Sequence, residues 1–152
     1  VKAHNAAVVG LTMDDRGIPN DADERLTIAR KIVEAAQREG IPLQDVIIDP
    51  LAIAVSAYDK AGVDTLDSLR KIRDELGVNQ TLGASNISFG LPERTAINAT
   101  FLAMAVMCGL TCPIIDPTVW EIRRTILLVD LLLGKDEFCM KYITAYRERS
   151  DQ

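Results

Sequence analysis

Segments typical of β-strands and of α-helices alternate four times along this chain, and this alternation constrains the fold more than any other feature. Short apolar runs are separated by longer stretches whose apolar residues recur at helical spacing. The pattern predicts strands over 6–13, 46–48, 81–87 and 113–115, and helices over 22–39, 63–76, 94–108, 119–133 and 137–149. The first run is apolar throughout, so we expect a strand buried on both faces. Strands and helices in this order form right-handed βαβ units with a parallel sheet.

Polar side chains stand where three of the predicted strands end, at Asp49, Asn86 and Asp116. In (β/α)8 barrels the catalytic residues lie at the carboxyl ends of the strands. A complete barrel needs about 250 residues, whereas this chain has 152. The sequence therefore predicts an α/β fold of the (β/α)8 TIM-barrel type. Residues 1–152 would form a single portion of it, roughly the C-terminal half, with four βα units and a C-terminal helix.

The charge balance and the cysteines limit the possible partners. The net charge is −5 and the pI is near 4.9, so we expect no nucleic-acid partner, because phosphates bind to basic faces. The apolar run 126–133 contains Asp130 and is shorter than the roughly 20 residues that cross a bilayer, so we expect no membrane segment. Three cysteines without a secretory signal favour buried free thiols in a cytoplasmic protein. His4 is the single histidine, and we expect no metal site.

Asn86 and Arg94 are the first candidates for a functional site. Asn86 ends the third predicted strand, where α/β proteins place their chemistry, and its amide both donates and accepts hydrogen bonds. Arg94 begins the next helix, where a cation opposes the helix dipole. This position points to an anionic ligand, although a salt bridge with Glu93, Asp116 or a preceding loop explains it equally well.

Short motifs in a fixed order resemble the pterin-binding methyltetrahydrofolate methyltransferase family. This family includes methyltetrahydrofolate:corrinoid methyltransferases and the folate domain of cobalamin-dependent methionine synthase, and dihydropteroate synthase is a more distant relative. The motifs are Leu-Thr-Met at 11–13, Gly-Ile-Pro-Asn at 17–20, Ile-Asp-Pro-Leu at 48–51, Gly-Ala-Ser-Asn-Ile-Ser at 83–88, Arg-Thr-Ala-Ile-Asn at 94–98 and Leu-Leu-Leu-Gly-Lys at 131–135.

The resemblance implies a (β/α)8 barrel that holds a pterin at its C-terminal mouth, and it implies roles for three residues. Asp49 would match the aspartate that binds the pterin ring, whose amidine-like edge suits a bidentate carboxylate. Asn86 would match the asparagine near N5, which carries the methyl group, and is the expected catalytic residue. Arg94 would match a basic residue on the folate side. Simpler roles remain open, since Asp49 can bond its own turn and Asn86 can cap one.

The activity implied by the resemblance is transfer of the N5-methyl group of methyltetrahydrofolate to the cobalt of a corrinoid protein. Methyltetrahydrofolate would be the methyl donor, and cobalamin would be carried by the partner protein. One alternative is a dihydropteroate synthase-like enzyme, although residues 85–94 contain a single basic residue for gripping a diphosphate. The other is a non-catalytic half-barrel that binds folate or serves in assembly. Because four βα units leave two open sheet edges, we expect a homodimer.

Overall fold

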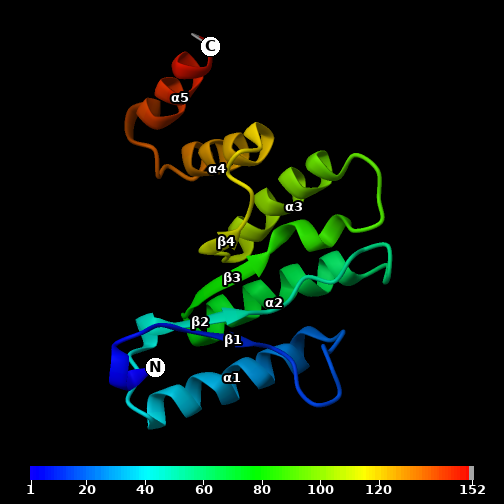
Figure 1. Ribbon diagram of the computed structural model, residues 1–152, viewed down its shortest axis with the longest axis vertical. Coiled ribbons are helices and arrows are strands. Elements are labelled where there is room, and N and C mark those ends of the chain that lie inside the picture. The colour runs from blue at the N-terminus through cyan, green and yellow to red at the C-terminus, as the bar shows by residue number, and fades with distance from the viewer. Residues whose placement is uncertain (151–152) are drawn as a thin grey trace.

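The computed structural model describes residues 1–150 and contains one parallel four-stranded sheet (Figure 1). The strands lie in the order β1-β2-β3-β4, as the alternation of strands and helices predicts. The strands are β1 (Val8–Leu11), β2 (Val46–Asp49), β3 (Asn79–Gly83) and β4 (Cys112–Ile114). The helices are α1 (Ala22–Arg38), α2 (Ala61–Leu76), α3 (Arg94–Cys108), α4 (Trp120–Leu132) and α5 (Met140–Ser150), and short 3-10 helices cover Lys2–His4, Leu43–Asp45, Ala84–Ser88 and Glu137–Cys139.

One face of the sheet packs against the first three α-helices and forms the core. Val46, Ile48 and Leu82 point toward these helices and are fully buried. Gly10 lies so close to α1 that a Cβ there would come within 2.6 Å of Ile32 Cγ2. Apolar residues of α1, α2 and α3 complete the core, among them Leu26, Ala29, Val33, Leu69, Ile72, Phe101, Leu102 and Ala105.

The opposite face, which we call the open sheet face, carries no such helix layer. Its residues, by strand alternation, are Val9, Leu11, Ile47, Asp49, Asn79, Thr81, Gly83, Cys112 and Ile114. Val9 is 51% exposed, Leu11 43% and Ile114 61%. The prediction that the first strand is buried on both faces is therefore wrong for this chain. A continuous apolar run shows that both faces suit burial, and here only one of them has a helix layer packed on it.

The third strand is shorter than predicted. It ends at Gly83, and Ala84–Ser88 forms a 3-10 helix where the sequence predicted strand up to residue 87. Ser88 Oγ donates to the Ser85 carbonyl oxygen at 3.3 Å, a local bond that competes with strand pairing. Asn86 therefore lies beyond the strand and not at its last residue.

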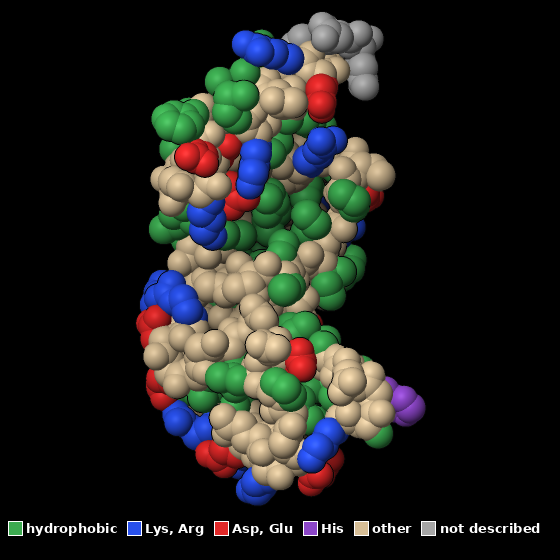
Figure 2. Space-filling view, turned by 90° about the vertical axis from the view of Figure 1, so that its left-hand side faces the viewer, with side chains coloured by type: hydrophobic (Ala, Val, Ile, Leu, Met, Phe, Trp, Pro, Cys, Tyr) green, Lys and Arg blue, Asp and Glu red, His purple; other side chains and the backbone are tan. Residues whose placement is uncertain are grey.

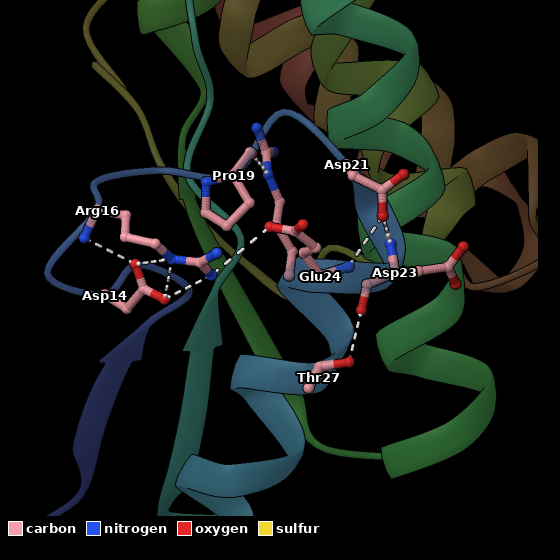
Figure 3. Close-up of polar contacts among 8 residues, drawn as sticks. Asp14, Arg16, Pro19, Asp21, Asp23, Glu24 and Thr27 are labelled. Atoms are coloured by element: carbon pink, nitrogen blue, oxygen red, sulfur yellow. Dashed lines mark hydrogen bonds and ion pairs between the residues drawn. The ribbon is translucent and has the colours of Figure 1, made fainter.

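The predicted helix over 137–149 is divided into a 3-10 turn and α5. Phe138 has a left-handed φ of 51°, which breaks the helical path. Asp136 then accepts the backbone N–H groups of Lys141 and Tyr142 at 2.9 Å each and starts α5. The first predicted helix is confirmed, and Asp21 caps it by accepting the N–H groups of Asp23 and Glu24 at 2.8 and 3.0 Å (Figure 3).

The elements follow one another along the long axis, from α1 beside β1 at one end to α5 at the other (Figure 1). The space-filling view shows an outline hollowed on one side, with hydrophobic side chains at the surface beside the hollow (Figure 2). No helix among the described residues is long and apolar enough to cross a membrane. All three cysteines are free; Cys108 is buried as predicted, whereas Cys112 and Cys139 are exposed.

Candidate functional site

Asp49 lies at the carboxyl end of β2 with its side chain on the open sheet face, where it is only 8% exposed. Its Oδ1 accepts the backbone N–H of Leu51 at 2.8 Å. Burial raises the pKa of the Asp49 carboxyl above its ordinary value, and the bond from Leu51 partly opposes this rise. Within the described chain its Oδ2 has no hydrogen-bond partner. This carboxylate is thus held by one bond and keeps accepting capacity for a ligand.

Asn86 returns toward the end of β3 although it lies three residues beyond that strand. A Cβ built on Gly83 would meet the Asn86 Nδ2 atom at 3.1 Å, so the amide lies against the backbone of Gly83. Gly83 belongs to the open sheet face, because its neighbour Leu82 points into the core. The side-chain amide of Asn86 has no hydrogen-bond partner in residues 1–150, and the residue is partly exposed.

Arg94 is the first residue of α3, as predicted, and its guanidinium turns back to the 3-10 helix that carries Asn86. Its Nε donates to Ser88 Oγ at 3.0 Å, and its Nη2 donates to the Ser85 carbonyl oxygen at 3.1 Å. The guanidinium also lies 4.6 Å from the ring centre of Phe89. The sequence left a ligand or a salt bridge as explanations for Arg94, and no salt bridge of Arg94 forms among the described residues. Arg94 instead supports the segment on both sides of Asn86.

The structure therefore places Asp49 and Asn86 on the same face of the sheet and at the same end of it, the carboxyl end of the strands. Both lie at the carboxyl ends of neighbouring parallel strands, β2 and β3. Asp116, which follows β4, is committed to a turn, since its Oδ1 accepts the Thr118 hydroxyl at 2.6 Å and the Thr118 N–H at 2.9 Å. These bonds hold the pKa of Asp116 below its ordinary value.

The sequence reasoning missed Arg25, which is fully buried beside this edge. Its guanidinium donates to the carbonyl oxygens of Pro19, Pro50 and Leu51. The signal was available in the pattern, because Arg25 falls on the apolar stripe of α1, between Ala22 and Leu26. A cation at a core position of an amphipathic helix is rare unless it is paired.

The loop between β1 and α1 lies at the same edge and is held mainly by its own polar contacts (Figure 3). Arg16 donates to the Asp14 carboxylate at 2.8 Å, and this bond lowers the pKa of Asp14. Both side chains are exposed. A cavity of about 690 Å³ lies elsewhere, beside the amino end of β3, with Asn79 and Thr111 in its lining. The candidate site residues Asp49 and Asn86 and this cavity therefore lie at opposite ends of the strands.

No group of three His, Cys, Asp or Glu side chains suited to a metal occurs among the described residues. The polar groups of the site are one carboxylate and one neutral amide on the open sheet face. The carboxylate can accept hydrogen bonds from two neighbouring N–H groups, and the amide can donate a hydrogen bond to a ring nitrogen or accept one from a ring N–H.

Comparisons with known proteins fit this arrangement. Residues 1–116 match the family model described as pterin binding enzyme. The chain is 31% identical over 144 residues to a methylcorrinoid:tetrahydrofolate methyltransferase of Eubacterium limosum, a match that covers 93% of this chain and 52% of that protein. It is also 31% identical over 123 residues to the methionine synthases of Mycobacterium leprae and Mycobacterium tuberculosis, covering 76% of this chain and 10% of each. The chain thus spans about half the length of the first relative.

Proposed function

The chain belongs to the pterin-binding enzyme family, and we propose that it binds methyltetrahydrofolate and takes part in methyl transfer between folate and a corrinoid protein. In the proposed direction the N5–methyl bond of methyltetrahydrofolate breaks while a bond from the methyl carbon to cobalt forms. The reduced cobalt of the corrinoid substrate supplies the electron pair, and N5 keeps the pair of the broken bond and takes up a proton. The name of the Eubacterium limosum relative describes the reverse transfer.

The observation that carries this proposal is the placement of Asp49 and Asn86 on the open sheet face, at the carboxyl ends of neighbouring strands. A reduced pterin presents a ring N–H beside an exocyclic amine, and one carboxylate accepts both. Asp49 has that capacity and is only 8% exposed, and such a pair is stronger at a buried carboxylate than in bulk water.

Asn86 would act on N5. A tertiary amine is a poor leaving group until it is protonated or hydrogen-bonded, and a neutral amide can donate to its lone pair or accept from N5–H. Since the Asn86 amide has no partner in the described chain, no internal bond has to break first. An interaction that strengthens as charge develops on N5 raises the rate of transfer more than the affinity for folate.

Arg94 would support the site by holding the 3-10 helix that carries Asn86. Two of its nitrogens hold the segment that carries Asn86, and its Nη1 makes no hydrogen bond within residues 1–150. We propose that Nη1 faces the anionic glutamate tail of folate. The single basic residue in 85–94 disfavours a dihydropteroate synthase-like reaction, which has to hold a diphosphate.

The open sheet face supports a barrel. We propose that residues 1–152 form half of a (β/α)8 barrel in the cytoplasm and that four further strands close it, from a second copy in a homodimer or from another part of a longer polypeptide. Val9, Leu11 and Ile114 would then point into the barrel interior, which side chains normally fill. The free edges of β1 and β4 would pair with the added strands.

Calorimetric titration with methyltetrahydrofolate tests the proposal, with the mass of the protein measured on the same sample. We expect saturable binding by a dimer, followed by methyl transfer when a reduced corrinoid protein is added. Binding without transfer would favour a non-catalytic folate-binding module. Binding of a pterin diphosphate in preference to methyltetrahydrofolate would favour the dihydropteroate synthase-like alternative. A folded dimer that binds neither ligand would contradict a pterin site in this chain.

A further inference from the structure

Arg25 joins the two loops that follow β1 and β2, and we propose that it is the positioning residue for Asp49. Its guanidinium fixes the turn at 49–51, and the Leu51 N–H of that turn orients the Asp49 carboxylate. The inference rests on the proposed pterin site for its functional meaning, and its structural content can be measured without a ligand.

The contacts of Arg25 reach both loops from one buried side chain. Arg25 is 0% exposed. Its Nε donates to the Pro19 carbonyl oxygen at 2.7 Å, in the loop before α1. Its Nη1 donates to the carbonyl oxygens of Pro50 and Leu51 at 3.0 Å each, in the turn after β2. Two different nitrogens of the rigid guanidinium fork bond these acceptors, whereas a lysine offers a single nitrogen for both loops.

The turn after β2 needs such support because Leu51 has a left-handed backbone, with a φ of 65°. A residue with a side chain pays conformational strain in this region and stays there only where its surroundings hold it. The Leu51 N–H shares one planar peptide group with the Pro50 carbonyl, so the Arg25–Pro50 bond fixes the plane that aims this N–H at Asp49 Oδ1, at 2.8 Å. Arg25 bonds the carbonyls on both sides of that N–H, so it holds the strained residue in place.

Stability alone does not account for this arginine. Its Nη2 is buried and has no hydrogen-bond partner among residues 1–150. Burial lowers the pKa of Arg25, and the charges of Asp64 and Tyr58 only partly oppose this effect. A protein with a well-packed apolar residue at such a position is often as stable as one with a buried charge, or more stable. The geometry of the two loops explains the guanidinium better than its contribution to folding does.

Amide hydrogen exchange in the full chain tests the structural content, with Arg25→Lys as the variant. We expect the Leu51 amide to exchange at least about tenfold faster, the effect of losing roughly one hydrogen bond's stabilisation. The amide of Ile48, in the core of β2, should exchange at the wild-type rate. Arg30→Lys is the matched control, because Arg30 lies on the same helix and forms an exposed ion pair with Glu75.

The second readout is the affinity for methyltetrahydrofolate and its rescue. Arg25→Lys should weaken binding about tenfold, and adding Leu51→Gly should restore most of it, because glycine adopts a φ of 65° without strain. An unchanged Leu51 amide, an equal increase at Ile48, or absence of rescue would overturn the inference. If Arg25→Lys does not fold, the Arg25→Lys/Leu51→Gly double variant should, and its failure to fold would also overturn it. If the wild type binds no folate, the pterin proposal fails, while Leu51 exchange still decides the role of Arg25.

Discussion

The side-chain amide of Asn86 rests against the backbone of Gly83, so close that a Cβ on Gly83 would lie 3.1 Å from Asn86 Nδ2. Gly83 is the last residue of β3, and Asn86 belongs to the 3-10 helix that follows. The absence of a side chain at Gly83 thus determines where the amide lies on the open sheet face.

Gly83→Ala should therefore displace the Asn86 amide without unfolding the protein. The backbone of Gly83 has a φ of −70°, which alanine adopts, so the added methyl acts mainly on its neighbour. We expect methyl transfer to slow by about tenfold or more, because small displacements of a catalytic group are costly. Gly62→Ala is the control, since a Cβ there meets Val55 at an ordinary 3.6 Å. Equal rates for Gly83→Ala and the wild type would show that the amide position is not critical.

Asn86→Ala should affect the rate of methyl transfer much more than the affinity for folate. Loss of one oriented donor to a developing charge costs about 100-fold or more in rate. Loss of one neutral hydrogen bond in the ground state lowers affinity by about fivefold. Stopped-flow transfer and calorimetric binding on the same variant give both numbers, and Asn20→Ala, in an exposed loop, is the control. Parallel losses of similar size would mean that Asn86 only binds.

Asp49→Asn should stabilise the protein at neutral pH while weakening pterin binding. Because burial raises the pKa of Asp49 in the folded state, folding favours its protonated form. The contribution of the Asp49 carboxyl to the free energy of unfolding is complete below its pKa in the unfolded chain. It is lost as the pH rises through its higher pKa in the folded state. An asparagine stays neutral and still accepts the Leu51 N–H, so its melting temperature should exceed that of the wild type at pH 7.

The gain in melting temperature should shrink as the pH is lowered below the pKa of Asp49. Thermal melts at several pH values measure it, with Asp15→Asn in an exposed loop as the control. Folate affinity should fall by at least about tenfold, since asparagine cannot pair with two donors as a carboxylate does. A variant that binds folate normally would remove Asp49 from the site, and a lower melting temperature at pH 7 would contradict the burial argument.

Arg94→Met should separate the two proposed roles of this residue. It removes the bonds to Ser85 and Ser88, so the transfer rate should fall with methyltetrahydrofolate and also with a methylated pterin that lacks the glutamate tail. Loss of the anion contact should lower affinity for methyltetrahydrofolate alone, by roughly tenfold. Arg124→Met, on the exposed side of α4, is the control. A normal rate with the tail-free pterin would exclude the supporting role, and equal affinity losses for both ligands would exclude the tail contact.

Periodicity predicted the parts of this molecule that depend on local pattern. The order of strands and helices, the start of α1 at Ala22 and the end of β2 at Asp49 follow from apolar spacing and polar strand ends. The path from Gly83 to Ser88 does not, because serine and asparagine bonds to nearby backbone decide it. The apolar stripe of α1 marks Arg25 as unusual, but its partners could not be predicted, for a similar reason. Its acceptors, the carbonyls of Pro50 and Leu51, lie 25 and 26 residues away, and no local pattern contains them.

The same limit applies to the open sheet face. An apolar strand such as β1 looks alike in the sequence whether both of its faces are covered or only one. The difference appears only when the register places Leu11 beside Asp49 and the helices are seen to share one side. Asp49, Asn86 and Arg94 remain predicted site residues, and the variants above decide among their roles.

The exposure of Val9, Leu11 and Ile114 also has a thermal consequence. Side chains that already contact water in the folded state add little to the heat capacity of unfolding, because that quantity reflects newly exposed apolar surface. A plot of the free energy of unfolding of this chain against temperature is therefore less curved than that of a chain with both sheet faces covered. Covering these side chains with further strands would increase that curvature.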